Sequence, residues 1–162
     1  MAASTSSNQL VSKHEFADVM ENTVSGQKSL HANVHFNAED VICSFDAELT
    51  LDHPTYATVQ IDDHTHIILK PEFLLYVNHS CSPNVFFNTD SMQLIALTEI
   101  QSGDEIVFFY PSVEWDMERP FNCFCGSSNC LKQIKGAAYL PHTVIQQYHL
   151  TDFIRQKINN QK

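Results

Sequence analysis

The stretch NHSCSPN at residues 78–84 decides how this chain folds, together with the run CFCGSSNC at residues 123–130. Four of the five cysteines lie in these two segments. Four thiolates are the ligand set of a closed, tetrahedral structural zinc site, and soft sulfur ligands favour zinc over harder metals. The run supplies Cys123, Cys125 and Cys130, so Cys81 is the natural fourth ligand. We therefore expect zinc to tie the end of the chain to its middle.

The alternative is that these residues are ordinary buried cysteines. Between Cys125 and Cys130 the chain reads Gly, Ser, Ser, Asn, and these residue types form turns readily. A ligand-bearing knuckle needs such turns and a core strand does not. The spacing therefore favours a metal site.

Three motifs together resemble the C-terminal half of a SET domain with its post-SET zinc segment. They are Asn-His-Ser-Cys-x-Pro-Asn at 78–84, Gly-Asp-Glu-Ile at 103–106 leading to Phe-Phe-Tyr at 108–110, and C-x-C-x4-C at 123–130. Their order and gaps match the SET protein-lysine methyltransferase family. The match is strong over about a third of the chain and weaker over another third.

The resemblance implies a mainly β fold with short helices: a SET-domain β-clip with a pseudoknot, a post-SET zinc knuckle and a C-terminal helix. In that pseudoknot the Asn-His-Ser-Cys segment and the strand before the closing tyrosine are threaded past each other, against the usual rule for chain connections. The implied divisions are a disordered tail at 1–9, the SET domain at 10–118, the post-SET segment at 119–140, and a helix and tail at 141–162.

The resemblance also implies S-adenosylmethionine as cofactor, with its methyl group displaced directly by a neutral amine, usually that of a lysine. Tyr110 stands where the family places its catalytic tyrosine. Asn78 and His79 match the cofactor-binding pair, and Leu131, directly after the last cysteine, matches part of the cofactor wall. Such a transfer depends on alignment at near-attack distance and on a deprotonated amine shielded from water.

The chain departs from the family where the cofactor's methionine part should lie. Family members usually carry Gly-x-Gly before a Leu-x-Ala strand, and aligning that strand with Leu30 and Ala32 puts Gln27 and Ser29 at the glycine positions. We expect these two residues to line the cofactor site. Side chains there obstruct the approach of bare backbone to a ligand.

Two further departures concern the acceptor pocket. Phe45 replaces the first residue of the family's Tyr-x-Gly-Glu, whose hydroxyl usually bonds the lysine amine, and Phe109 replaces the aspartate common before the catalytic tyrosine. Both changes make the pocket more apolar and less suited to an amine that can be protonated.

Local patterns predict several further elements. Alternation at residues 30–36, a turn at 37–40 and an apolar run at 41–45 predict a hairpin, with His31 and His35 on its solvent face. A second hairpin is expected from strands at 56–61 and 64–69. Proline at position 71 suits a short helix that leads into the Asn78 motif. The apolar spacing at 143–158 predicts one amphipathic helix.

The charge balance restricts the partners. Nineteen acidic and nine basic side chains give a net charge of -10, which repels phosphate backbones and favours a basic peptide over nucleic acid. No apolar run reaches the roughly 20 residues that span a bilayer, and no signal sequence is visible. We expect an intracellular protein, cytoplasmic or nuclear, with metal-bound thiolates and a fifth cysteine, Cys43, that is buried.

Acidic residues also flank Trp115, a few positions after Tyr110 in the chain: Glu114, Asp116 and Glu118. They form either an acidic lip for a cationic substrate, with Trp115 as a cation-π face, or a solvated loop anchored by one buried tryptophan.

Three functions fit these observations. The first is S-adenosylmethionine-dependent methyl transfer to a lysine of a protein. The second is a divergent SET-like fold that has lost lysine methylation and binds or converts a small apolar molecule, as a binding module or as an isomerase or cyclase of secondary metabolism. The third is a zinc-stabilised interaction domain without a pocket.

Overall fold

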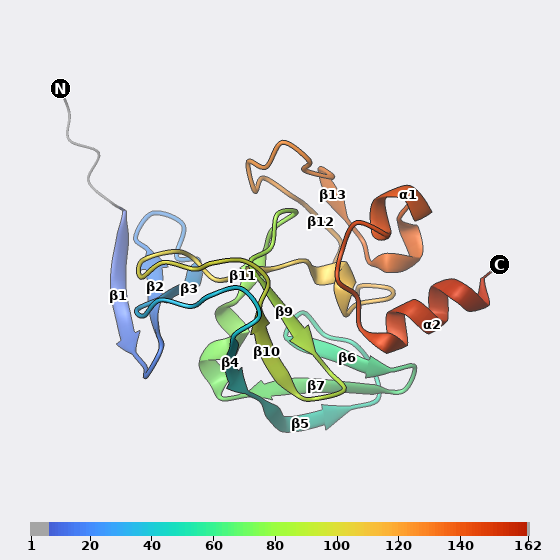
Figure 1. The fold of residues 1–162 in the computed structure, drawn as a ribbon, viewed down its shortest axis with the longest axis horizontal. Helices are drawn as coiled ribbons and strands as arrows, with labels where there is room; N and C mark the ends of the chain where they lie inside the picture. Colours follow the sequence, from blue (N-terminus) through green and yellow to red (C-terminus); the bar gives the residue numbers. More distant parts are fainter. Residues whose placement is uncertain (1–6, 162) are drawn as a thin grey trace.

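The computed structural model describes residues 7–161 of the chain. It is mainly β, with small sheets and few short helices, as the sequence predicts (Figure 1). The largest sheets each have three antiparallel strands. In the order in which they pair, their strands are β1 (Asn8–Lys13), β2 (Ala17–Asn22) and β3 (Lys28–Ala32); β4 (Val41–Ser44), β10 (Gln93–Ala96) and β9 (Val85–Asn88); and β5 (Asp46–Leu51), β7 (Thr65–Lys70) and β6 (Thr58–Asp62).

Two pairs of short strands complete the β structure. One pair is parallel and the other antiparallel. They are β8 (Asn78–His79) with β11 (Val107–Phe108), and β12 (Phe121–Asn122) with β13 (Gln133–Ile134). The helical elements are the 3-10 helices η1 (Glu72–Tyr76), η2 (Tyr110–Ser112) and η3 (Ala137–Tyr139), and the α-helices α1 (His142–Ile145) and α2 (Asp152–Asn160).

The main core lies between the three-stranded sheets. Alternate residues of β2, β9 and β10 are buried, because successive side chains of a strand point to opposite faces. Leu30, Leu74, Phe87, Leu94 and Ile100 are at most 1% exposed and belong to this core. A second cluster forms under the C-terminal helices and consists of Ala137, Ile145, Leu150 and Ile154.

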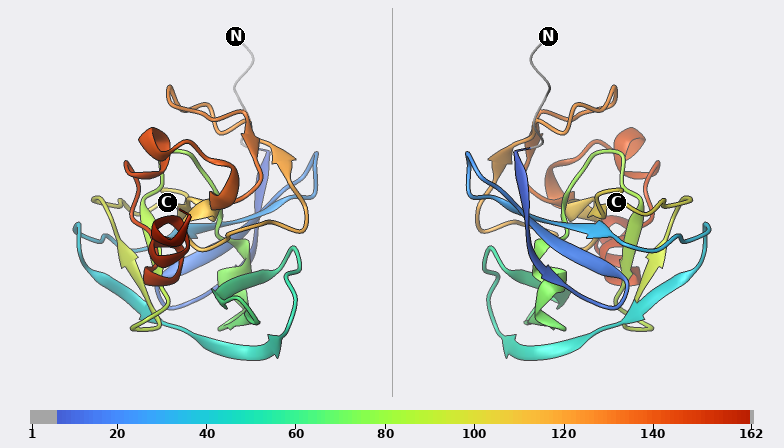
Figure 2. Two further views of the ribbon diagram at one scale, coloured as in Figure 1. Left: turned by 90° about the vertical axis from the view of Figure 1, so that its right-hand side faces the viewer. Right: turned by 90° about the vertical axis from the view of Figure 1, so that its left-hand side faces the viewer.

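The β1–β3 sheet and the C-terminal helices lie on opposite sides of the molecule. The left view of Figure 2 brings the helices to the front and the right view brings β1 to the front. Between them, the loop that joins β12 to β13 projects from the top of Figure 1. None of the helices within residues 7–161 has the length and apolar character needed to cross a membrane.

Three predicted local elements differ in the structure. The hairpin expected from residues 30–45 is wrong, because β3 pairs with β2 and β4 pairs with β10. Alternation identifies the buried face of a strand but not the neighbour with which it pairs. Residues 1–6 of the expected disordered tail lie outside the described residues, whereas Asn8 and Gln9 belong to β1. The expected helix at 143–158 is two helices, and the hydroxyl of Thr151 caps the second by accepting the Ile154 N–H at 3.3 Å.

Other local predictions are confirmed. The segments at 56–61 and 64–69 form the β6–β7 hairpin. Pro71 directly precedes η1, which leads to Asn78. The expected burial of Cys43 is only partial: the residue is half-buried against the main core, and this raises the pKa of its thiol to about 11.

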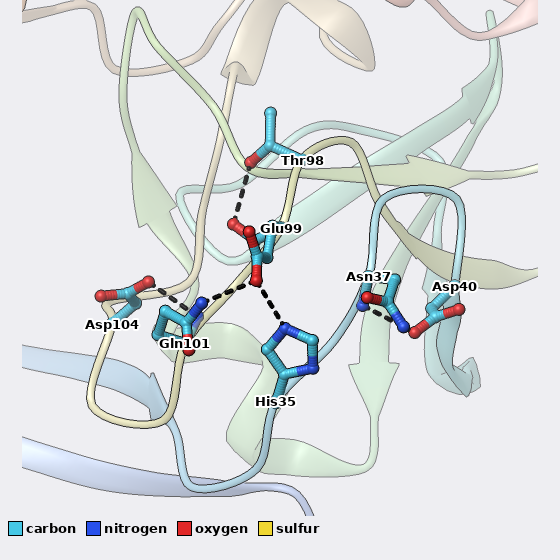
Figure 3. A network of polar contacts seen from close by, with 7 residues as sticks. All are labelled: His35, Asn37, Asp40, Thr98, Glu99, Gln101 and Asp104. Atoms are coloured by element: carbon cyan, nitrogen blue, oxygen red, sulfur yellow. Dashed lines mark hydrogen bonds and ion pairs between the residues drawn. The ribbon is translucent and has the colours of Figure 1, made fainter.

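A polar network fastens the loop after β3 to the loop after β10 (Figure 3). The carboxylate of Glu99 lies 2.8 Å from His35 Nε2 and accepts a hydrogen bond from Gln101 Nε2 at 2.7 Å. Beneath it, Phe36 and Ile100 exchange backbone hydrogen bonds of 2.9 Å in each direction. Because Glu99 is exposed, its ion pair adds little stability, and the backbone pairing is the stronger constraint.

The loop at 114–117 is held by the segment around Gly136. Ala137 N–H donates to Glu114 O and Ala138 N–H donates to Trp115 O, each at 2.9 Å. Gly136 has a φ of +120°, and a Cβ at this position would lie 2.4 Å from Trp115 O. Only glycine allows this close approach of two backbone segments.

We expect Gly136→Ala to destabilise the protein by about 1–3 kcal/mol more than Gly103→Ala, because only the first variant forces two backbone segments apart. Gly103 also has a positive φ, +99°, but a Cβ there would meet no atom within 4 Å. Urea unfolding of the two variants measures the difference. Equal losses would mean that the contact with Trp115 does not constrain the fold.

Candidate functional site

The parallel pairing of β8 with β11 brings the NHSCSPN stretch beside the strand that leads to Tyr110. Ser80 N–H donates to Phe108 O at 3.0 Å, and Asn84 N–H donates to Val107 O at 3.1 Å. The Asn84 side chain adds two more bonds: its Oδ1 accepts Val107 N–H at 2.9 Å and its Nδ2 donates to Glu105 O at 2.8 Å. Two segments far apart in the sequence are therefore joined at the centre of the site.

The four cysteines expected as zinc ligands come together. The Sγ atoms of Cys81, Cys123, Cys125 and Cys130 all lie within 4.8 Å of one another. In a tetrahedral site with Zn–S bonds of about 2.3 Å, the sulfur atoms are separated by about 3.8 Å, and Cys81 Sγ lies 4.0 Å from Cys123 Sγ. The donor set and its spacing thus fit a zinc ion.

The surroundings of Cys81 fit a metal-bound thiolate. Leu131 N–H donates to Cys81 Sγ at 3.4 Å. The backbone carbonyl of Cys81 accepts hydrogen bonds from Tyr148 Oη at 2.7 Å and from Asn129 Nδ2 at 3.0 Å. Burial raises the pKa of the Cys81 thiol to about 12, so a cation is needed to hold it as a thiolate at neutral pH.

A large polar cavity of about 630 Å³ opens between the β1–β3 sheet and the cysteine loop. Its lining includes four of the five residues expected at the cofactor and the expected catalytic tyrosine: Gln27, Ser29, Asn78, His79 and Tyr110. The fifth, Leu131, packs against the cysteine cluster and is not in this lining.

Residues of the β2–β3 hairpin reach this cavity by strand alternation. Leu30 and Ala32 are buried in the core, so Ser29 and His31 lie on the opposite face, which lines the cavity. His31 Nδ1 lies 3.2 Å from Gly103 O and its Nε2 lies 2.9 Å from Ser29 Oγ. A proton on Nδ1 satisfies both contacts, because Nε2 then accepts the hydroxyl proton.

His31 lies on the face away from the core, as expected, and that partly exposed face forms a wall of the cavity. The same alternation that identified Leu30 and Ala32 could have identified His31 as a site residue. Phe124 also lines the cavity and is 91% exposed. Its signal in the sequence was an aromatic residue between two expected metal ligands, Cys123 and Cys125.

Asn78 and His79 are held by hydrogen bonds within the protein. Asn78 Nδ2 donates to Lys28 O at 2.9 Å, which joins the NHSCSPN stretch to β3. His79 Nδ1 accepts the backbone N–H of Tyr110 at 3.1 Å. Burial lowers the pKa of His79 to about 4, so the ring is neutral at pH 7 and can act as this acceptor.

Tyr110 lies where the large cavity meets a second one. Both linings contain it, and its ring packs against His79, Phe108 and Phe121, with centroids 4.6–5.7 Å away. Burial raises the pKa of Tyr110 to about 12. The phenol is therefore protonated at neutral pH and can donate a hydrogen bond into either cavity.

The second cavity is smaller, about 160 Å³, and mostly apolar. Val59, Leu69, Leu74, Val77 and Phe108 supply much of its wall. Glu114 also lines it, although the side chain is largely buried. Burial raises the pKa of Glu114 from 4.5 to about 8, against a hydrogen bond from the Gln60 backbone that lowers it.

The family described as "SET domain" matches residues 9–111. The chain belongs to the SET-domain family. Among its relatives, "Methyltransferase flvH" from Aspergillus flavus is 42% identical over 103 residues, which are 62% of this chain and 57% of that protein. An H3 lysine-36 specific histone-lysine N-methyltransferase of Chaetomium globosum is 26% identical over 90% of this chain and 19% of its own length. "Histone-lysine N-methyltransferase 2D" of Homo sapiens is 33% identical over 35% of this chain and 1% of its own length.

This SET domain thus spans between 1% and 57% of the length of those relatives.

The two phenylalanines that depart from the family's motifs lie outside both cavities. Phe45 packs against Phe87 in the main core, with ring centroids 5.5 Å apart, and Phe109 stacks on Tyr148 at 3.7 Å. Neither residue is in the described lining of the large or the small cavity. A role for Phe45 in the reaction stays a prediction.

Zinc binding can be tested by replacing one cysteine of the cluster. We expect purified Cys125→Ser to carry much less than one zinc per chain, because a closed structural site needs all four of its ligands. The matched control is Cys43→Ser, since Cys43 lies outside the cluster. Elemental analysis of both proteins gives the zinc content. Full zinc occupancy in Cys125→Ser would remove that thiol from the ligand set.

The protonation of Glu114 predicts a pH dependence of stability. A carboxyl whose pKa is raised in the folded state stabilises the fold below its unfolded pKa, and this contribution is lost as pH rises through the folded pKa. We expect the free energy of unfolding of the wild type, relative to that of Glu114→Gln, to fall by about 2 kcal/mol between about pH 6 and pH 8.5. Urea unfolding at several pH values measures it; a constant difference would contradict the raised pKa.

Proposed function

We propose that this SET domain transfers the methyl group of S-adenosylmethionine to an amine, with a lysine side chain of a protein as the acceptor. One observation carries the proposal. Tyr110 separates a large polar cavity from a small apolar one and belongs to the lining of both. A methyl donor in the first cavity and an amine in the second would meet at this residue, which is the alignment that direct transfer requires.

The large cavity fits the donor in size and polarity. Its volume of about 630 Å³ lies within the range of cofactor sites. Gln27 and Ser29 reduce the room that two glycines would leave, but this volume remains with both side chains in place. Asn78, His79, Gln27 and Ser29 would hold the cofactor, and Leu131 would contribute from the cysteine loop.

When bound, S-adenosylmethionine supplies an electrophilic methyl group on a sulfonium. The chain's own residues then have to position the acceptor and exclude water. The Tyr110 hydroxyl, which is protonated because its pKa is raised to about 12, donates a hydrogen bond that orients the acceptor. Phe108 and Phe121, packed around Tyr110, keep water from the reacting atoms.

Zinc would act as a structural ion beside the cofactor. The cysteine loop forms part of the large cavity through Cys123, Phe124 and Cys125. A structural zinc can contribute on the order of 10 kcal/mol to folding. Loss of the ion would therefore disorder a wall of the cofactor site as well as the loop itself.

The acceptor class rests on charge and on the relatives. The net charge of -10 attracts a basic peptide and speeds its encounter. Relatives include proteins described as histone-lysine N-methyltransferases. The alternative of an isomerase or cyclase has no comparable support among them.

Calorimetric titration of zinc-loaded protein with S-adenosylmethionine tests the first half of the proposal. We expect one site with a micromolar dissociation constant. If folded, zinc-replete protein shows no heat of binding, the proposal that S-adenosylmethionine is the cofactor is wrong, and so is the proposed methyl transfer.

Tyr110→Phe tests the second half. We expect methyl transfer to lysine-containing peptides to fall by about 100-fold, because the acceptor loses its orienting hydroxyl, while cofactor binding is retained. Tyr139→Phe is the matched control. Tyr139 is 55% exposed, its hydroxyl donates a hydrogen bond to Asp116, and neither residue lines the large or the small cavity. Equal activity of the two variants would show that the Tyr110 hydroxyl has no role in the reaction.

A further inference from the structure

The small cavity has room for only a compact group. Its volume is about 160 Å³, and an apolar protein cavity of about 150 Å³ holds a benzene molecule. The acceptor portion that enters it is therefore limited to roughly six non-hydrogen atoms. The aminobutyl end of a lysine side chain fits this limit, and so does a small free amine.

Glu114 supplies a buried carboxyl group to this mostly apolar cavity. The residue is 8% exposed. Its backbone is held on both sides, because its N–H donates to Tyr110 O at 3.0 Å and its carbonyl accepts Ala137 N–H at 2.9 Å. The carboxyl group therefore stays beside Tyr110, in the lining that the two residues share.

Only one of the two carboxyl oxygens is used by the protein. Glu114 Oε1 accepts the backbone N–H of Gln60 at 3.1 Å. Within residues 7–161, no hydrogen bond or ion pair to Glu114 Oε2 is present. The Gln60 side chain is engaged elsewhere, with its Oε1 accepting Trp115 N–H at 2.9 Å.

A purely structural role does not account for this carboxyl group. A glutamine at position 114 could accept the same Gln60 N–H through its side-chain oxygen. It would do so without the cost of placing an ionisable group in an apolar cavity. The feature that a glutamine lacks is the ability to carry a negative charge and to take up a proton.

We propose that Glu114 recognises the amine of the acceptor: its free oxygen pairs with the ammonium end of a compact aliphatic chain in the small cavity and accepts one proton from it before methyl transfer. This inference rests on the proposed function for its last step only. The binding of an alkylammonium ion by Glu114 is independent of the methyl donor.

The proton and the electrons balance in this scheme. The ammonium N–H bond breaks and its proton forms an O–H bond on Glu114, which leaves a neutral amine and a neutral carboxylic acid. The amine lone pair then forms the N–CH3 bond while the S–CH3 bond of S-adenosylmethionine breaks, and that electron pair stays on sulfur. The products are a methylated ammonium ion and neutral S-adenosylhomocysteine, and Glu114 returns its proton to solvent when the product leaves.

The apolar surroundings favour that proton transfer. An ion pair in an apolar cavity loses its hydration, whereas the neutral amine and carboxylic acid lose much less. Burial already raises the pKa of Glu114 to about 8, so the carboxylate that accepts the proton prevails above about pH 8, where an alkylammonium ion is still charged. The other titratable or charged groups of this lining are Tyr56, Tyr110, Glu118 and Arg119, and of these Tyr56, Glu118 and Arg119 belong to exposed residues.

This role of Glu114 would offset the apolar substitutions noted in the sequence. Phe45 and Phe109 stand where family members carry a hydroxyl and a carboxylate, and both lie outside the small cavity. The polar partner of the amine is supplied instead from the segment after Tyr110. Of the three acidic residues around Trp115, the buried one faces the cavity and Asp116 is not in its lining.

The test uses the zinc-replete full chain without S-adenosylmethionine and two probes, n-butylamine and 1-butanol. At about pH 9, above the pKa of Glu114, the first still carries the skeleton and charge of a lysine side chain, and the second is its neutral counterpart. Binding is followed by NMR shift changes on titration. We expect Glu114→Gln to weaken n-butylamine binding by about 10- to 100-fold, because a charge-assisted hydrogen bond is lost, and to leave 1-butanol binding unchanged.

Two further variants make the result specific. Asp116→Asn removes the same charge two positions along the chain, outside the cavity lining, and should leave binding of both probes unchanged. Leu75→Phe narrows the cavity from its wall and should weaken both probes. If Glu114→Gln and the wild type bind n-butylamine equally, or if Asp116→Asn weakens it as much as Glu114→Gln does, the proposal is overturned.

The source of the amine is distinguished by competition. A lysine-containing basic peptide that displaces n-butylamine from the wild type identifies a protein side chain as the occupant. Displacement by small free amines but not by the peptide identifies a small-molecule acceptor. Both results support amine recognition by Glu114. If the wild-type protein does not bind n-butylamine at all, amine recognition by Glu114 is contradicted.

The outcome is separable from that of the proposed function. Glu114-dependent amine binding without any affinity for S-adenosylmethionine would leave this inference intact and remove methyl transfer. Methyl transfer that is unchanged in Glu114→Gln between about pH 7 and pH 9 would leave the proposed function intact and overturn the role of Glu114 as proton acceptor.

Discussion

The short parallel pairing of β8 with β11 is the constraint on which the site depends. It aligns only two residues of each strand, Asn78 with Val107 and His79 with Phe108. Parallel pairs this short are weak by themselves, but the Asn84 side chain adds one bond to Val107 of β11 and one to Glu105 just before it. Because His79 also accepts the Tyr110 N–H, the position of the tyrosine follows from the pairing.

The cysteine cluster extends that constraint to the C-terminal segment. Cys81 comes two residues after β8, and its carbonyl is bonded by Tyr148 and Asn129. Tyr148 stacks on Phe109 with the rings 7° from parallel. A metal bound by the four thiolates would thus connect β8, the cysteine loop and the helical end of the chain, and the large cavity lies against this assembly.

The two cavities differ in the physical problem that each solves. The large one is polar and open, and it exposes the side chains of Gln27 and Ser29 where the family's pattern would leave bare backbone. The small one is apolar, and its single largely buried carboxyl group is costly unless a ligand pairs with it. A cost of this kind is typical of functional sites, where a group is kept for its chemistry and not for the stability of the fold.

The sequence by itself determined the cysteine cluster, the family and the mainly β class, and it singled out Tyr110 as the expected catalytic residue. These features depend on residue type and local spacing, which are visible along the chain. Strand alternation likewise identified Leu30 and Ala32 as buried.

Only the tertiary structure decided which strands pair, where the helical segment at 143–158 breaks, and which of the acidic residues near Trp115 is buried. The pairing of β3 with β2 and of β4 with β10 is a choice among partners that share the same alternating pattern. Glu114 is covered by β6 from more than 50 positions away, through the Gln60 N–H. The burial of Glu114, and therefore its raised pKa, depends on such distant neighbours, so it cannot be predicted from the local sequence.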